Sequence, residues 1–300
     1  MEFYSPGKIL LTGEYLVLEG VKGLALPTQK GQKMRVSPTP ENKVVWKSYT
    51  EDNQCWVDCT FSLDGKLKDA KHTHPSVVHQ LEQLFNIMLR LAPQKFPSGF
   101  CIESFLEFPQ NWGLGSSSTF VHNLAQWLVI NPYELLDLTM GGSGYDIAVA
   151  QHGCPLFYER DKYHPKIEKV EFQPSFSENL FFVHLNEKRK SSDAIAGFSK
   201  KKKASSDTKK RIAEIGERIC QSNNQKEFDA LLKEHEDLLS SLLGEASVQK
   251  RLFADFEGQL KSLGAWGGDF ILASGNASTS AYFDAKGYTT VIPFSDFIKA

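Results

Sequence analysis

The chain has 300 residues, of which 41% are hydrophobic and 23% are charged, values typical of a globular protein in water. This length corresponds to two average domains or one large one. The composition excludes a disordered chain, a collagen-like fibre and a small disulfide-rich domain. No segment approaches the roughly 18 consecutive apolar residues of a membrane helix, and the first residues lack a secretory signal pattern. With five scattered cysteines, the sequence predicts a cytoplasmic protein with reduced thiols and no membrane partner.

The charge is distributed unevenly along the chain. The net charge of −2 predicts no general affinity for nucleic acid. Segment 188–211, however, holds ten Lys or Arg and two Asp, a net charge of +8 that leaves −10 for the remainder. It lacks the interleaved aromatic residues of a single-stranded nucleic-acid site. Its first cations, Lys188, Arg189 and Lys190, either bind a small anion or belong, like the run at 200–203, to a solvated loop.

The first half of the sequence predicts mainly strands. Apolar runs indicate strands at 8–18, 34–36, 44–49 and 55–62, and Asp64-Gly65 predicts a turn. A helical pattern opens at Pro75 and ends before Pro93. A strand at 100–108, a helix at 119–130 and a strand pair within 146–158, interrupted by Gly153 and Pro155, follow.

The second half alternates strands with longer helices. A strand is expected at 180–185, helices over 212–219 and 228–242, and short strands at 270–274, 281–283 and 289–292. The character of the sequence changes near residue 175, so we expect two domains, residues 1–175 and 176–300, in an α+β fold.

The most informative segment runs from Pro109 to Thr119 and contains Gly113-Leu114-Gly115-Ser116-Ser117-Ser118. It lies between a predicted strand and a predicted helix. Glycines allow a close approach of backbone to ligand, and the free amides at a helix N-terminus bind anions. The alternative is an ordinary loop whose serine caps the helix. The segment is neither a Walker loop nor a dinucleotide-binding fingerprint.

Two further glycine-containing segments strengthen this prediction. Pro6-Gly7-Lys8 stands near the N-terminus, followed by Gly13-Glu14-Tyr15, and Gly264-Ala265-Trp266-Gly267-Gly268 stands near the C-terminus. In order and spacing the three segments resemble the GHMP kinases, the superfamily of galactokinase, homoserine kinase, mevalonate kinase and phosphomevalonate kinase. The resemblance covers essentially the whole chain. It implies two lobes, the first similar to domain 2 of ribosomal protein S5 and the second ferredoxin-like.

The resemblance also implies roles for individual residues. ATP and Mg²⁺ would be the cofactors, and the string Gly144-Tyr145-Asp146-Ile147-Ala148 would supply the catalytic carboxylate, Asp146, with Lys8 as its cationic partner. Ser117 would contact Mg²⁺, and Glu14 is a candidate second ligand. The remaining expected residues fall into two groups. Those for the nucleotide are Gly113, Leu114, Gly115, Ser116, Ser117, Ser118, Gly267 and Gly268, and those for the substrate are Glu14, Tyr15, Gly144, Tyr145, Lys188 and Arg189.

The resemblance implies that the acceptor is a small anionic metabolite, with mevalonate and phosphomevalonate as the first candidates. Mevalonate kinases usually have His where this chain has Tyr15, and Gly-Glu-Tyr is more similar to phosphomevalonate kinase. Two alternatives stay open: an inactive nucleotide or metabolite sensor on the same scaffold, and a related diphosphomevalonate decarboxylase. A monomer and a homodimer are both compatible with the sequence.

Overall fold

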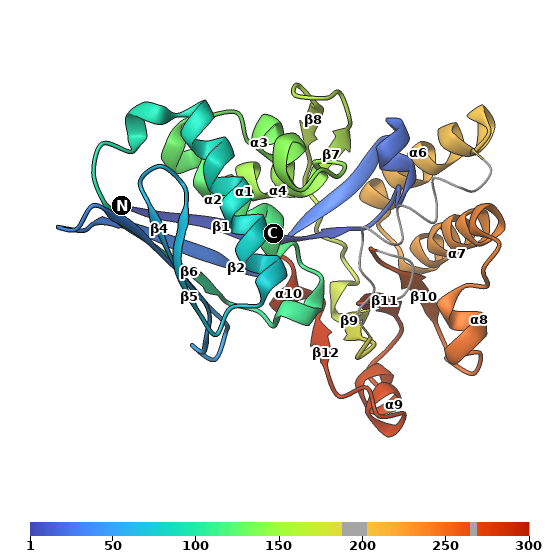
Figure 1. Cartoon of the computed structure of the whole chain (residues 1–300). Coiled ribbons are helices and arrows are strands. Elements are labelled where there is room, and N and C mark those ends of the chain that lie inside the picture. The colour runs from blue at the N-terminus through green and yellow to red at the C-terminus, as the bar shows by residue number, and fades with distance from the viewer. Residues whose placement is uncertain (188–202, 265–268, 300) are drawn as a thin grey trace. The chain divides into compact units, whose positions relative to one another are not determined.

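The computed structural model describes residues 1–187, 203–264 and 269–299 (Figure 1). Packing divides the chain into two compact units. The first comprises Met1–Gly7, Lys30–Gln110 and Gly115–Gln151, and the second comprises Lys8–Gln29, Asn111–Leu114 and His152–Ala300. The units are therefore interleaved along the sequence. The domain boundary expected near residue 175 stays a prediction.

The first unit is built on a sheet in the order β5-β4-β3-β6-β2, with β1 paired to β2. β3 and β6 run parallel, whereas the other neighbouring strands of this series run antiparallel. Burial alternates along β3, so that Val44, Trp46 and Ser48 face the interior, as expected for a sheet with one covered face. The strands expected at 44–49 and 55–62 are confirmed. The strand bounds are β1 (Glu2–Leu10), β2 (Gly23–Pro38), β3 (Lys43–Tyr49), β4 (Cys55–Ser62), β5 (Leu67–Lys71) and β6 (Phe100–Leu106).

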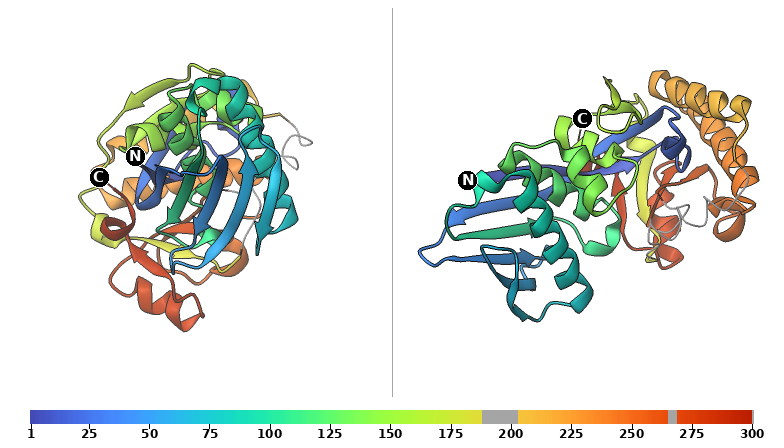
Figure 2. Two further views of the ribbon diagram at one scale, coloured as in Figure 1. Left: turned by 60° about the vertical axis from the view of Figure 1, so that its left-hand side comes forward. Right: turned by 45° about the horizontal axis from the view of Figure 1, so that its top comes forward.

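Helices cover one face of this sheet (Figure 2). Phe85 of α1 packs edge-on against Trp46 of β3 and Phe100 of β6, with ring centroids 6.4 and 6.2 Å apart. Such aromatic pairs contribute to the core beyond their buried area. The short elements η2 (Pro93–Lys95) and η3 (Gln110–Trp112) flank β6. The helices are α1 (Pro75–Leu91), α2 (Ser116–Leu128), α3 (Pro132–Thr139) and α4 (Tyr145–His152).

The second unit contains a four-stranded antiparallel sheet in the order β10-β11-β9-β12. The strands are β9 (Leu180–His184), β10 (Gln259–Ser262), β11 (Phe270–Ser274) and β12 (Val291–Pro293). Helices separate β9 from β10, yet β11 lies between these two strands. This is the split β-α-β arrangement of a ferredoxin-like fold, which confirms the expected topology.

The helices of the second unit include two long ones, α6 and α7, which lie side by side (Figures 1 and 2). Ser205 and Asn224 cap their N-termini through side-chain oxygens, as caps of these residue types do. β7 and β8 extend from the first residues of β2. In the part of the chain that the structure describes, no helix combines the length and apolarity needed to cross a membrane. The bounds are η1 (Leu16–Glu19), β7 (Leu156–Glu159), β8 (Lys166–Lys169), η4 (Ser177–Asn179), α6 (Ser206–Gln221), α7 (Gln225–Leu243), α8 (Val248–Leu252), α9 (Thr279–Ala285) and α10 (Phe294–Phe297).

Three expected elements are wrong. The strand pair within 146–158 is helix α4 followed by β7, and the strand at 281–283 lies within helix α9. Both runs are short and apolar, and such runs do not distinguish a buried strand from a buried helix. The strand expected at 8–18 instead begins at Glu2 and ends at Leu10, so that Pro6-Gly7-Lys8 lies inside β1.

Candidate active site

Helix α2 begins at the serine segment of the central motif. Gly115 occupies the N-cap position in the left-handed conformation (φ 85°), which glycine adopts without steric cost. The first helical hydrogen bond runs from the Thr119 N–H to the Gly115 carbonyl (2.9 Å). The amides of Ser116, Ser117 and Ser118 precede it, and amides in this position have no partner within a helix. The Thr119 hydroxyl donates to Gln32 of β2 (2.7 Å), which fixes this helix end to the sheet.

Asp146 lies in the first turn of α4, in the same unit as the start of α2. The Ser118 hydroxyl donates a hydrogen bond to Asp146 Oδ2 at 2.5 Å. Gly144, immediately before α4, has a φ of 88°, and its carbonyl accepts from the Ala148 amide (3.1 Å). The glycine thus turns the chain so that the carboxylate meets the serine segment. Ser118 and Asp146, both expected site residues, are therefore in direct contact within the first unit.

The preceding piece of the motif, Asn111–Leu114, belongs to the second unit together with Lys8. Lys8 Nζ donates to the Gly113 carbonyl (3.0 Å), and the Lys8 amide donates to the Leu114 carbonyl (3.1 Å). Trp112 packs edge-on against Phe270 of β11, with ring centroids 5.4 Å apart. The first and central motifs therefore meet directly within this unit. Since Lys8 and Asp146 belong to different units, the expected partnership between them stays a prediction.

Gly113 also lies against Asp269, the residue before β11. Gly113 has a φ of 67°, and a Cβ built on it would lie 2.1 Å from Asp269 Oδ2 and 2.5 Å from Asp269 Cγ. Real atoms cannot approach so closely, so glycine is required here both for its conformation and for its missing side chain. The carboxylate of Asp269 occupies the place that any other residue at position 113 would fill.

Glu14 and Tyr15 follow β1 in the second unit and are strongly constrained. Glu14 is buried and receives a hydrogen bond from the buried Lys261. Burial raises the pKa of Glu14, whereas the positive charge of Lys261 opposes this effect. Tyr15 has a φ of 62°, an uncommon conformation for a non-glycine residue. It packs against the apolar cluster that includes Leu16 and Ile212.

No protein-family model matches the sequence, and no curated protein matches it. Solved structures do resemble the fold. The mevalonate kinase of Methanococcus jannaschii is 17% identical, with 95% of this chain and 94% of that chain covered and a TM-score of 0.68. The phosphomevalonate kinase of Streptococcus pneumoniae, solved with phosphomevalonate and AMPPNP, is 14% identical, with 95% of both chains covered and a TM-score of 0.69. The chain has the GHMP kinase fold.

A third structure with this fold is a D-glycero-D-manno-heptose 1-phosphate kinase from Bacteroides thetaiotaomicron, 15% identical, with 99% of this chain and 96% of that chain covered and a TM-score of 0.68. The GHMP kinase structures therefore include proteins named for different acceptors. The similarity confirms the expected fold class. The roles of individual residues rest on the contacts in this chain.

For some residues expected from the GHMP kinase motifs, the predicted role stays a prediction. Gly267, Gly268, Lys188 and Arg189 lie outside the described residues. Ser117 is exposed in the first turn of α2, next to the serine that contacts Asp146. Its contact with Mg²⁺ stays a prediction, as does a substrate contact for Tyr145, which directly precedes Asp146.

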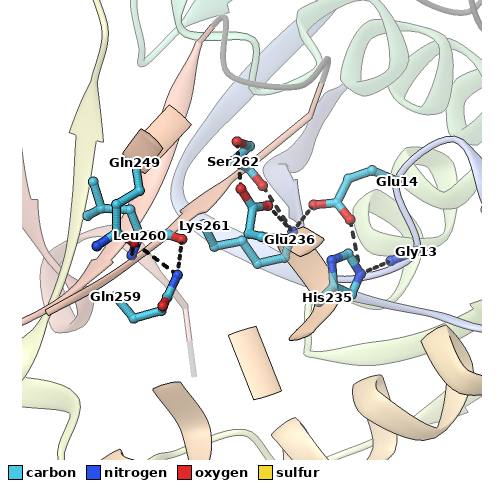
Figure 3. Close-up of polar contacts among 9 residues, drawn as sticks. All are labelled: Gly13, Glu14, His235, Glu236, Gln249, Gln259, Leu260, Lys261 and Ser262. Carbon is cyan, nitrogen blue, oxygen red and sulfur yellow. Dashed lines mark hydrogen bonds and ion pairs between the residues drawn. The ribbon is translucent and has the colours of Figure 1, made fainter. Parts of the chain in front are cut away.

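Several polar residues near the GHMP motifs were not expected from the sequence. Asp269 lies against Gly113. His235 and Lys261 contact Glu14, and Glu236 lies 3.7 Å from Lys261 on the side away from Glu14 (Figure 3). One signal was present, because His235 falls on the apolar stripe of α7, where a polar residue needs a buried partner. Lys261 gave no such signal, because an isolated lysine is usually exposed.

Proposed function

We propose that the protein is an ATP-dependent kinase that phosphorylates a small anionic metabolite of the mevalonate or phosphomevalonate class. One observation carries this proposal: the Ser118 hydroxyl at the start of α2 contacts the Asp146 carboxylate at the start of α4. The serine segment provides amides suited to the phosphates of ATP. The carboxylate beside it is suited to accept the proton of an acceptor hydroxyl.

The chemistry of Asp146 follows from its hydrogen bond. Ser118 engages Oδ2, so the proton of the acceptor hydroxyl would pass to the other oxygen, Oδ1, as the hydroxyl oxygen attacks the terminal phosphorus of ATP. The bond from that phosphorus to the bridging oxygen breaks, and ADP leaves. We propose that Lys8 stabilises the negative charge that develops on the transferred group. For a phosphate acceptor, which carries no such proton at neutral pH, Asp146 would orient the attacking oxygen instead.

The residues around the serine segment fit a magnesium ion. Mg²⁺ prefers oxygen ligands and typically takes only one or two carboxylates, the rest being water and phosphate. The exposed hydroxyl of Ser117, in the first turn of α2, is a ligand of this kind. The described residues hold no group of three or more His, Cys, Asp and Glu that would form a metal cage, which suits an ion held largely by ATP. Bound there, Mg²⁺ would neutralise phosphate charge.

The proposal is tested by incubating the protein with Mg-ATP and a panel of acceptors: mevalonate, its phosphorylated forms, sugars and homoserine. ADP, the phosphorylated product and CO₂ are each measured. Transfer to an acceptor supports a kinase, whereas CO₂ release from a diphosphate would indicate a decarboxylase. Nucleotide binding without turnover on any acceptor would indicate a sensor and refute the proposal.

The variant Asp146→Asn tests the role of the carboxylate. We expect its kcat to fall about 10²–10⁴-fold, the usual contribution of general acid–base catalysis, while AMPPNP binding is retained. Asp284→Asn, at an exposed position in the second unit, is the matched control and should leave both quantities unchanged. Full turnover by the Asp146 variant would show that this carboxylate does not act in the reaction.

A further inference from the structure

A cluster of ionisable side chains lies buried in the second unit around Lys261 (Figure 3). We name it the Lys261 cluster; it consists of Glu14, His235, Glu236, Lys261 and Ser262. Lys261 and His235 are 0% exposed, Glu14 is 1% exposed and Glu236 is 2% exposed. Burying charges costs several kcal/mol per ion unless they are paired. Such a cluster therefore needs a reason to persist.

The contacts within the cluster are specific. Lys261 Nζ donates to Glu14 and to the Ser262 carbonyl (3.0 Å). Its distance to Glu236 Oε1 is 3.7 Å. The Ser262 hydroxyl donates to Glu236 Oε2 (3.0 Å). The lysine thus lies between two carboxylates and donates a hydrogen bond to one of them, Glu14.

His235 attaches the Gly13–Tyr15 turn to helix α7. The Gly13 amide donates to His235 Nε2 (3.2 Å). Because an amide can only donate, Nε2 must be the unprotonated nitrogen. Burial and the nearby Lys261 hold the pKa of His235 well below its usual range. The histidine is therefore neutral, and its contact with Glu14 Oε2 (3.4 Å) is not an ion pair.

The turn held by these contacts has an unfavourable backbone. Gly13 has a φ of 86° and Tyr15 a φ of 62°, so two of three consecutive residues have a positive φ. Non-glycine residues in this region cost about 1–3 kcal/mol and persist where surrounding contacts fix them. A Cβ on Gly13 would lie 3.1 Å from the Gly23 Cα, so the turn also fits tightly against β2. The Lys261 cluster supplies the contacts that such a turn requires.

The turn and the lysine adjoin two different motifs. The Gly13–Tyr15 turn follows β1, which carries Lys8. Lys261 lies on β10, which leads into the glycine segment that opens at Gly264. We propose that Lys261 is a positioning residue for phosphoryl transfer, which through Glu14 fixes the Gly13–Tyr15 turn and with it the strand that carries Lys8. This inference rests on the proposed kinase function.

A single substitution cannot test this proposal, because Lys261→Met leaves buried carboxylates without their counter-ion. Breaking a buried pair in this way should lower the melting temperature by about 10 °C. The double variant Lys261→Met with Glu14→Gln removes both charges and nearly conserves volume, and such neutral replacements are often tolerated. We expect it to recover most of the lost melting temperature. Lys250→Met, which breaks an exposed ion pair with Asp237, is the matched control.

The kinetic result then separates positioning from folding. We expect the double variant to show a kcat about 10²-fold below that of the native protein, the scale expected for a misplacement of about 1 Å. Its affinity for AMPPNP and its Mg²⁺ requirement should stay within about threefold. A raised Mg²⁺ requirement would show that Glu14 is a metal ligand and would overturn the proposal. A stable double variant with native kcat would overturn it as well.

Hydrogen exchange gives a readout that does not depend on turnover. We expect faster exchange over residues 8–18 in the double variant than in the native protein, with the first unit unchanged. Unchanged exchange over 8–18 would overturn the positioning role even if no acceptor were phosphorylated. Absence of phosphoryl transfer by the native protein would instead refute the proposed function, so the two failures are distinguishable.

Discussion

Gly113→Ala should destabilise the second unit through two separate effects. The first is conformational, because the φ of 67° at Gly113 is a left-handed value that costs an alanine about 1 kcal/mol. The second is steric. The new Cβ would lie 2.1 Å from Asp269 Oδ2, 2.5 Å from its Cγ and 3.0 Å from its Cβ. Rotation of the Asp269 side chain moves the first two atoms but not its Cβ, so the backbone must move as well.

The two effects together define the expected magnitude. Inserting an atom into a well-packed site costs about 1–3 kcal/mol, so Gly113→Ala should lower the free energy of unfolding by about 2–4 kcal/mol. Gly244→Ala is the matched control. Gly244 belongs to the same unit and has a φ of 65°, and a Cβ built on it meets nothing within 4 Å. Its substitution should cost only about 1 kcal/mol.

The assay is urea-induced unfolding of both variants, monitored by tryptophan fluorescence. AMPPNP binding is measured on the same variants. Adding Asp269→Ala to Gly113→Ala removes the two closest clashes and should recover part of the lost stability. If Gly113→Ala cost no more than Gly244→Ala, or if Asp269→Ala recovered nothing, the steric argument would be refuted. Weaker AMPPNP binding by Gly113→Ala alone would connect this contact to the nucleotide site.

Two further predictions concern stability. Burial is the main cause that raises the pKa of Glu236, from 4.5 to about 7. The folded state therefore holds this proton more tightly than the unfolded state, and the stabilisation is complete below pH 4.5 and lost as the pH rises through about 7. Between pH 4 and 8 this effect should lower the free energy of unfolding by up to about 3 kcal/mol. The variant Glu236→Gln cannot ionise and should lack this decrease. A variant whose unfolding has the same pH profile as that of the native protein would contradict the prediction. The second prediction concerns Val129, which is 79% exposed at the C-cap of α2 and has a φ of 60°. Because glycine adopts this conformation without steric cost, Val129→Gly should raise the free energy of unfolding by about 1 kcal/mol. A lower unfolding midpoint would show that the valine makes compensating contacts.

The fold could be predicted where a periodic pattern spans a whole element. Strands β3 and β4 match the expected runs, because burial alternates residue by residue along both. Helix α1 begins at Pro75 as expected, since proline is favoured in the first turn. Helices α4 and α9 differ from the strands predicted there, because they have only 8 and 7 residues. Over such lengths the tertiary environment, rather than the local pattern, decides the structure.

The candidate site could be predicted in part. The motifs located the serine segment and Asp146, because glycine and serine at a helix start carry a local signal. The hydrogen bond between Ser118 and Asp146 joins residues 28 positions apart, and no local pattern specifies which of three adjacent serines makes it. The partner of Glu14 lies 247 positions away. Such a contact depends on how β10 and the turn after β1 fold together.

The Lys261 cluster shows why the two carboxylates around the lysine are not equivalent. One lysine and two ionised glutamates would bury a net negative charge, which costs free energy that the neutral His235 cannot offset. Protonation of one glutamate removes this cost. Glu236 lies 3.7 Å from the Lys261 ammonium, whereas Glu14 accepts its hydrogen bond directly. Glu236 is therefore the residue that takes the proton, and Glu14 is the residue whose charge balances Lys261. On this basis the positioning role that we propose for Lys261 acts through Glu14 at the turn rather than through Glu236 on helix α7.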